Sequence, residues 1–254
     1  MCWLLIVLVV TVNTAASQSS NCPNRQLIEQ SLEKVHIPGA AIVVVNATHI
    51  LYEQAFGYQS LAPAQPMNID KSIFPIASIS KTFIAAAAVM QLVDLDTDIN
   101  QYLSELDKNI FHPRYPSHSI TLRKLLSHSA LIAVSSQVQD TYYRPGDTAF
   151  VESLADMVFT YVNPNTSYWL PKPSGSATWY SNEGAALATL VVERIARISY
   201  IDYIKENIFR PLGVNISNIG VHLADFASTE DFVKHYAYAF IHPISKDETK
   251  KYHS

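Results

Sequence analysis

The 254-residue sequence lacks the residue patterns that build metal centres, phosphate sites and disulfide frameworks. It has only two cysteines, and its nine histidines show neither the His-x-x-x-His nor the His-Glu-x-x-His spacing of zinc sites. With only seven glycines, it also has no glycine-rich phosphate loop and no Gly-x-Ser-x-Gly turn, which disfavours the α/β-hydrolase fold. We therefore expect neither a metal nor a cofactor.

Charged residues are also scarce, at 16% of the chain, and the net charge is −4. A mildly acidic chain without a basic run argues against nucleic acid as the main partner. Hydrophobic residues reach 48%, which suits one or two globular domains with a sizeable core. A small-molecule or peptide-like substrate therefore remains the expected partner. The composition does not indicate the oligomeric state.

Residues 1–17 are typical of a secretory signal, although no lysine or arginine precedes the apolar part. The mostly apolar stretch Trp3–Val12 is too short to span a bilayer, and small residues follow it, so we expect cleavage near Ala16 or Ser17. No other apolar run reaches about 18 residues, so the mature chain is expected to be soluble and free of the membrane. The expected location is extracellular or lumenal.

The cysteines and the glycosylation sequons fit that location. Cys2 would leave with the signal and Cys22 would remain alone, so the mature chain could form no internal disulfide. Three Asn-x-Ser/Thr sequons are present, which permit but do not prove glycosylation in a secreted eukaryotic protein. Their asparagines are Asn46, Asn165 and Asn215.

The periodicity predicts an α+β fold with a small N-terminal sheet and a mostly helical remainder. Strands are expected over 40–46 and 50–57, joined as an antiparallel hairpin, and because a lone hairpin is barely stable, further strands should belong to it. Residues 58–72 and 163–176 read as irregular. Helices are expected over 26–35, 80–93, 121–129, 152–161, 183–197 and 201–209.

The most informative local feature is Ser78 with Lys81. Lys81 is the only charged residue between Ser72 and Val93, in an otherwise apolar stretch. An ammonium buried there without an acid partner would lose hydration, which favours the neutral amine that can accept a proton. Since positions i and i+3 of a helix share a face, this amine could activate the Ser78 hydroxyl as a nucleophile.

The Ser-x-x-Lys spacing alone is weak evidence, because it occurs twice. The second instance, Ser31-Leu-Glu-Lys34, lies in an amphipathic helix pattern with Glu29 and Glu33, where the lysine is simply solvated and paired. A structural alternative also stays open for Lys81, which could extend from a core helix to solvent.

A second proton-handling group is expected near the nucleophile, and the segment that begins at Trp179 supplies a candidate. Tyr180 precedes a predicted helix, and a phenol beside an ammonium ionises more easily. Asn182 could hold a substrate carbonyl or amide. The same Tyr-x-Asn spacing recurs at Tyr161-Val-Asn163, so the spacing is not specific by itself.

Taken in order, four segments resemble the serine β-lactamase-like and penicillin-binding-protein-like hydrolases, specifically the class C β-lactamase and DD-peptidase branch. FPIASISKTFIAAAAVMQLV is similar to the nucleophile helix of that family, and LVDLDTDINQYL to the segment after it. ITLRKLLSHSAL resembles its Leu-Leu-x-His helix, and WYSNEGAALATLVVERIARISYIDYIKENIFRPLGV its Tyr-Ser-Asn segment and long helix. The resemblance covers about residues 23–240.

The resemblance implies a β-lactamase-like fold and assigns a role to each candidate. Ser78 would form the acyl-enzyme, and its backbone N–H would be one oxyanion donor. Lys81 would ease proton transfer from Ser78, Tyr180 would exchange protons with Ser78 and the leaving group, and Asn182 would bind the substrate amide. His128 would be a structural histidine that hydrogen-bonds a loop, rather than half of a Ser–His pair.

The sequence departs from the family at two places. The third family motif, Lys-Thr-Gly or His-x-Gly on an edge strand, is absent between Pro211 and Ser254, and Ala130-Leu131 replaces Ser-Gly. We therefore expect a C-terminally truncated member whose sheet is partial. Its expected parts are a signal over 1–17 and a β-lactamase-related domain over 18–254, with an α/β portion at 18–75, a mainly helical portion at 76–225 and a polar tail at 226–254.

Two hypotheses follow for function. In the first, the chain is a secreted serine hydrolase that cleaves an ester or amide through an acyl-serine intermediate. In the second, it is a catalytically inactive binding or structural homologue, or a truncated product, because the third motif is missing.

Overall fold

The computed structural model describes residues 24–91, 93–103, 108–140, 153–226 and 228–236. The expected signal, Cys2, Cys22 and most of the polar tail lie outside these residues. The chain divides into two compact units: one runs up to Pro75 and takes in the residues from Ser228 on, and the other is Ile76–Ala227. In the part of the chain that the structure describes, no helix is both long and apolar enough to cross a bilayer.

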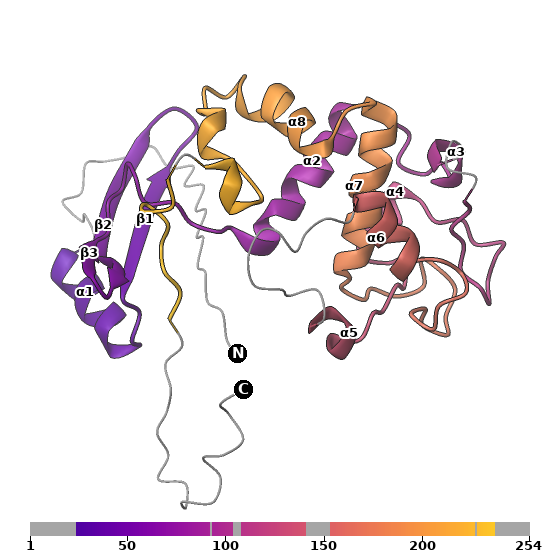
Figure 1. Ribbon diagram of the computed structural model, residues 1–254, viewed down its shortest axis with the longest axis horizontal. Helices are drawn as coiled ribbons and strands as arrows, with labels where there is room; N and C mark the ends of the chain where they lie inside the picture. Colours follow the sequence, from indigo (N-terminus) through magenta and orange to yellow (C-terminus); the bar gives the residue numbers. More distant parts are fainter. Residues whose placement is uncertain (1–23, 92, 104–107, 141–152, 227, 237–254) are drawn as a thin grey trace, which may run out of the picture. The chain divides into compact units, whose positions relative to one another are not determined.

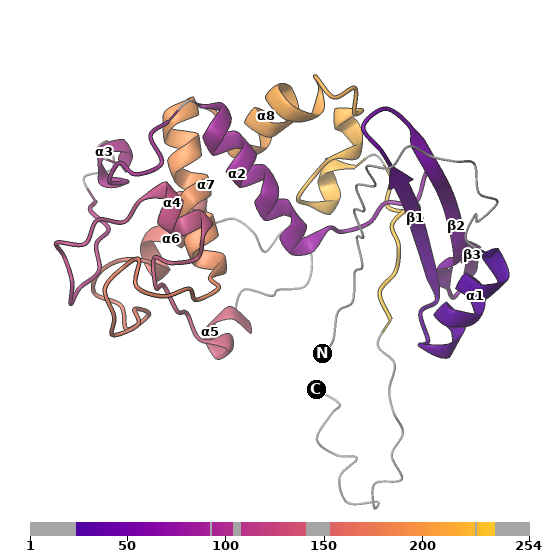
Figure 2. The ribbon, with the colours of Figure 1, turned by 180° about the vertical axis from the view of Figure 1, so that it is seen from behind.

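The first unit is a three-stranded antiparallel sheet with one helix (Figures 1 and 2). Helix α1 (Arg25–Lys34) begins where Asn24 accepts a hydrogen bond from the Gln26 N–H, and it lies beside the sheet because Arg25 donates to Gln54 of the second strand. The strands are β1 (Gly39–Val45), β2 (Ile50–Leu61) and β3 (Ala64–Pro66), in the order β1-β2-β3.

The sheet corrects the expectation that residues 58–72 are irregular. Strand β2 continues to Leu61, and β3 pairs with its end. The sequence pattern missed this because buried polar side chains interrupt the apolar alternation. Gln59 is buried and is satisfied by Ser72, which donates to its Oε1 at 2.5 Å, and by the carbonyl of Glu230, which accepts from its Nε2 at 3.2 Å.

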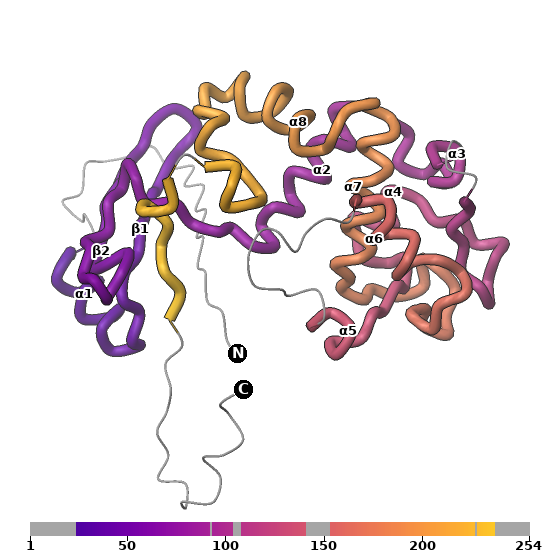
Figure 3. The backbone as a smooth tube through the Cα atoms, viewed as in Figure 1, coloured from indigo at the N-terminus to yellow at the C-terminus, as the bar shows by residue number. Residues whose placement is uncertain are grey.

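The second unit is helical, as predicted, and its path can be followed in Figure 3. The 80–93 prediction is confirmed as α2 (Lys81–Met90), which follows a short 3-10 helix, η1 (Ala77–Ser80). The predicted last helix, 201–209, is split into α8 (Tyr200–Ile204) and one π-helical turn, η4 (Lys205–Phe209). The other described helices of this unit are α3 (Asn100–Leu103), α4 (Leu122–Leu126), α5 (Ser136–Asp140), α6 (Leu154–Tyr161) and α7 (Asn182–Ala196), with two short 3-10 turns, η5 (Ile216–Asn218) and η6 (Leu223–Asp225), after α8.

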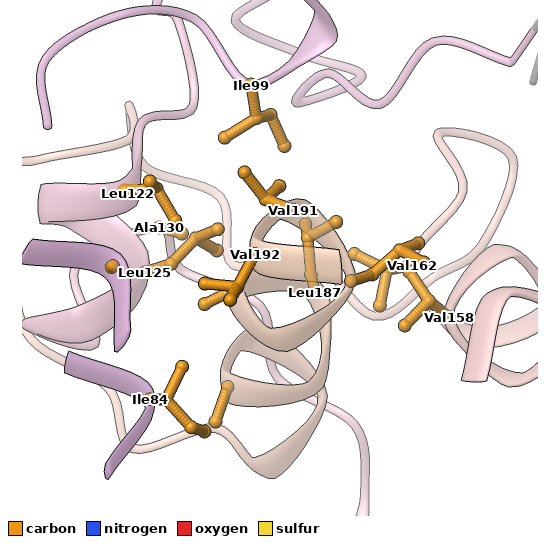
Figure 4. Close-up of a cluster of buried hydrophobic side chains, with 14 of the residues drawn as sticks. Ile84, Ile99, Leu122, Leu125, Ala130, Val158, Val162, Leu187, Val191 and Val192 are labelled. Carbon is orange, nitrogen blue, oxygen red and sulfur yellow. The ribbon is translucent and has the colours of Figure 1, made fainter. Parts of the chain in front are cut away.

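Helix α7 is the centre of this unit. It is rich in alanine and leucine, Ser181 caps its N-terminus, and Arg197 ends it with a left-handed φ of 58°. It packs against α2, α4, α6 and α8, and Figure 4 shows its apolar side chains meeting those of the neighbouring helices. The segment that carries Tyr180 therefore leads directly into a helix that is largely buried.

Candidate active site

Ser78 and Lys81 lie one turn apart at the junction of η1 and α2. Lys81 Nζ donates to Ser78 Oγ at 3.1 Å. The sequence suggested that the two residues share one α-helix, and the structure corrects this: Ser78 is in the 3-10 turn and Lys81 is the first residue of α2. Ala77, just before Ser78, has a φ of 45°, which is unusual for a residue with a side chain and is the kind of local strain that gathers at functional sites.

The structure also brings Tyr180 to this pair. Its hydroxyl lies 2.7 Å from Ser78 Oγ, and Lys81 Nζ lies 5.0 Å from the centre of its ring. Because the lysine can only donate to Ser78 Oγ, the serine is free to donate its own proton to the tyrosine oxygen. The three side chains thus form a continuous path along which a proton can move.

The surroundings of Tyr180 favour its ionised form. Partial burial raises the pKa of the phenol, but hydrogen bonding to Lys81 and Ser78 and the charge of Lys81 lower it by more, so the pKa lies below its usual value. Tyr180 is nonetheless 53% exposed, so a substrate can reach it. The result is a phenol that can accept the serine proton.

Lys81 is only partly buried, which corrects the expectation of an ammonium fully removed from water. It is the first residue of α2, a position from which a long side chain can extend from an apolar helix toward solvent. Among the described residues Lys81 forms no ion pair with a carboxylate, and its polar neighbours are Ser78 and Tyr180.

His128 holds the segment on which Tyr180 lies. Its carbonyl accepts from the Trp179 N–H at 2.8 Å, and its Nδ1 accepts from the Ser181 N–H at 3.3 Å. Its ring also packs on that of Tyr180, with 4.5 Å between centres. The prediction of a structural histidine bonded to a loop is confirmed.

Glu183 is a residue that the sequence analysis missed. It is 2% exposed, and its carboxylate accepts from Gln139 Nε2 at 3.0 Å and from Ser181 Oγ at 3.2 Å. The first contact ties α5 to the start of α7. The only sequence signal was an acidic residue in the first turn of a helix, which is common on surfaces and does not reveal burial.

Asn182, the first residue of α7, is exposed. In the described part of the chain, no hydrogen bond joins its side chain to Ser78, Lys81 or Tyr180. Its exposed amide is therefore not taken up by these three residues, and among the described residues it is accessible to a ligand.

The two similar-looking motifs behave as structural residues. Ser31 Oγ donates to the carbonyl of Leu27 at 2.7 Å, and Lys34 is exposed at the end of α1. Asn163 donates its amide to the carbonyl of Phe159 at 2.9 Å. The structure therefore distinguishes the Ser78/Lys81 pair from its counterpart in α1.

None of the described residues forms a group of three or more histidine, cysteine, aspartate or glutamate side chains placed to hold a metal. The chemistry of the described site is that of a hydroxyl, an amine and a phenol. This combination suits acyl transfer through a serine nucleophile.

Comparison with known proteins agrees with this geometry. Residues 24–231 match the family model described as Beta-lactamase. The chain is 25% identical to Penicillin-binding protein 4* of Bacillus subtilis (strain 168) over 223 residues, which cover 87% of this chain and 46% of that protein. It is 24% identical to Protein flp of Staphylococcus aureus (strain N315), over 74% of this chain and 36% of that one.

Solved structures show the same fold. A class C beta-lactamase superposes with a TM-score of 0.60 at 21% identity, over 82% of this chain and 52% of its own. EstCE1, a hydrolase with promiscuous acyltransferase activity, gives 0.62 at 19% identity, over 75% of this chain and 51% of its own. The octameric penicillin-binding protein homologue from Pyrococcus abyssi gives 0.60 at 24% identity, over 75% and 42%. The chain spans less than half the length of the curated relatives that it matches.

Proposed function

Since this chain belongs to the beta-lactamase family, we propose that it is a serine hydrolase that cleaves an ester or amide bond through a covalent acyl-serine intermediate. The observation that carries the proposal is the hydrogen-bonded path from Lys81 through Ser78 to Tyr180. The alternative of an inactive binding or structural homologue is not favoured, because all three groups are present and in contact.

In acylation, Ser78 Oγ attacks the carbonyl carbon of the substrate while its proton passes to the Tyr180 oxygen, which Lys81 stabilises as the phenolate. The tetrahedral intermediate collapses as the bond to the leaving group breaks, and Tyr180 returns the proton to that group. Water then attacks the acyl-serine along the same path in reverse, so the enzyme is restored.

Two further groups are proposed to hold the substrate. The Ser78 N–H lies in the first turn of η1, where backbone N–H groups have no partner inside the helix, and we propose that it donates to the oxyanion. The exposed amide of Asn182 is proposed to bind a substrate carbonyl or amide. Relatives described as penicillin-binding proteins and class C beta-lactamases favour a small-molecule or peptide-like substrate, D-amino-acid peptides among them.

Covalent labelling tests this proposal directly. The protein is incubated with a fluorescent fluorophosphonate or a fluorescent penicillin, and the labelled residue is identified by mass spectrometry. We expect labelling of Ser78 that is lost in Ser78→Ala and unchanged in Ser31→Ala, the matched variant in the other Ser-x-x-Lys sequence. Labelling that persists in Ser78→Ala rejects the assignment, and a folded wild-type protein that takes up neither probe favours the inactive homologue.

Secretion and glycosylation are proposed as well, on the evidence of the signal and the sequons. All three asparagines are exposed, and at two of them the side-chain Oδ1 accepts from the hydroxyl residue of its sequon: Thr48 to Asn46 at 3.3 Å and Ser217 to Asn215 at 2.9 Å. These two hydrogen bonds use the Oδ1 atom, so they do not involve the amide nitrogen that would carry the glycan.

When the chain is expressed in a eukaryotic secretory cell, the protein recovered from the culture medium should begin near Ser17 and lose mass on treatment with peptide N-glycosidase. Each of the variants Asn46→Gln, Asn165→Gln and Asn215→Gln is expected to remove one glycan, because each deletes one acceptor amide. Protein that stays in the cytosol with its N-terminal 17 residues intact contradicts the proposal.

A further inference from the structure

His128 contacts three successive residues, Tyr180 and the residue on each side of it. The residue before Tyr180 donates its N–H to the His128 carbonyl at 2.8 Å, and the residue after it, Ser181, donates its N–H to His128 Nδ1 at 3.3 Å. The Tyr180 ring itself lies against the imidazole, tilted by 40° with 4.5 Å between centres. The position of the phenol is therefore fixed from the His128 side as well as from Ser78.

The bond from Ser181 decides the protonation state of His128. A backbone N–H can only donate, so Nδ1 must be an acceptor and carries no proton in this arrangement. A doubly protonated imidazolium has no acceptor, and its Nδ1–H would face the Ser181 N–H. The contact is thus made by neutral histidine and is lost on protonation.

Among the described residues, the charged group that acts electrostatically on the His128 imidazole is the Lys81 ammonium of α2. The segment before α7 also contacts the imidazole, through the Tyr180 phenol and the Ser181 N–H. Burial lowers the pKa of His128 below its ordinary value of 6.5, and the positive charge of Lys81 lowers it further. Neutral histidine is therefore the form present at neutral pH, and protonation is expected only in acid.

We propose that neutral His128 is a positioning residue that holds Tyr180 against Ser78 and Lys81, and that protonation of His128 releases Tyr180 and slows acylation of Ser78. The proposal rests on the proposed function for its effect on reactivity. Its structural part does not depend on turnover: the contacts of His128 that hold Tyr180 in place, here called the clamp, and the loss of these contacts in acid.

Two substitutions separate the hydrogen bond from the bulk of the side chain. His128 has a left-handed φ of 56°, which asparagine tolerates better than most residues. In His128→Asn the Oδ1 atom, like Nδ1, is bonded to Cγ, so it can accept from Ser181 but cannot be protonated. In His128→Leu the volume remains while the acceptor is lost.

The experiment measures the rate constant for fluorophosphonate labelling of Ser78 from pH 4.5 to 8.5. Loss of one partly buried hydrogen bond and a misplaced Tyr180 should slow labelling of His128→Leu about 10- to 100-fold at pH 8. His128→Asn should remain within about threefold of the wild-type protein at pH 8. Wild type should show an additional loss of rate in acid with a midpoint below 6.5, and in His128→Asn only the decrease that comes from protonation of Tyr180 should remain.

Nuclear magnetic resonance gives a readout that needs no turnover. In wild type, histidine nitrogen shifts should show Nδ1 of His128 without a proton at pH 8, and the Tyr180 ring signals should change with the His128 titration. The inference is overturned if Nδ1 carries the proton at pH 8, if the Tyr180 signals ignore the titration, or if His128→Leu is labelled as fast as wild type. A wild-type protein that is not labelled at all refutes the proposed function, and the resonance measurement then decides the clamp alone.

Discussion

Replacing Lys81 with methionine is expected to slow acylation of Ser78 about 1000-fold, because it removes the charge that makes Tyr180 an effective proton acceptor, and a positioned acid–base group contributes about 100- to 10,000-fold. Methionine keeps a long unbranched side chain but removes the ammonium that donates to Ser78 Oγ at 3.1 Å. The same change removes the charge that lowers the pKa of Tyr180, so the phenol would hold its proton more tightly and accept the serine proton less readily. The labelling rate constant with a fluorophosphonate measures the loss.

Two variants make this prediction specific. Lys34→Met changes the lysine of the other Ser-x-x-Lys sequence, at the exposed end of α1, and should leave the rate within about twofold of the wild-type protein. Lys81→Arg keeps the positive charge that stabilises the Tyr180 phenolate, but it replaces a compact ammonium with a larger planar guanidinium of different donor geometry, so it should restore only part of the rate. A Lys81→Met protein that is labelled at the wild-type rate would remove the lysine from the mechanism.

The sequence alone distinguished the two Ser-x-x-Lys pairs by their surroundings. Lys34 lies among glutamates in an amphipathic pattern, whereas Lys81 stands alone in an apolar stretch, and the structure finds the first exposed and the second in contact with Ser78. Such a contact is local, within one helical turn, and so the pattern could indicate it. Tyr180 is 102 residues from Ser78; the sequence made it only a candidate, and the resemblance to a family assigned it to this partner.

The parts that the sequence missed depend on burial of polar groups and on tertiary contacts. Gln59 in β2 and Glu183 in α7 are both buried, and each has a hydrogen bond to a residue distant in sequence. Hydrophobic periodicity assigns such residues to the surface. The clamp on Tyr180 joins His128 to Ser181 across 53 residues, which no local pattern encodes.

The stability of the site depends on the helix that follows Tyr180, so Leu187→Ala in the core of α7 is expected to be strongly destabilising. Leu187 is 0% exposed, and Figure 4 shows it directed toward Val158 and Val162 at the α6 side of α7. Deleting its buried methyl groups loses transfer free energy and leaves a cavity, together worth about 3 kcal/mol. In a unit of this size the midpoint of thermal unfolding should fall by about 10 °C.

Leu212→Ala provides the control, because Leu212 is 71% exposed and its truncation should change the free energy of unfolding by less than about 0.5 kcal/mol. Since Ser181 caps α7 directly after Tyr180, labelling of Ser78 in Leu187→Ala should be lost at the lowered unfolding temperature while remaining near the wild-type rate well below it. Calorimetry and labelling measured over the same temperatures test this link. If Leu187→Ala melts like Leu212→Ala, α7 is not the core of this unit; if labelling is lost far below the melt, the substitution acts on the site without unfolding the helix.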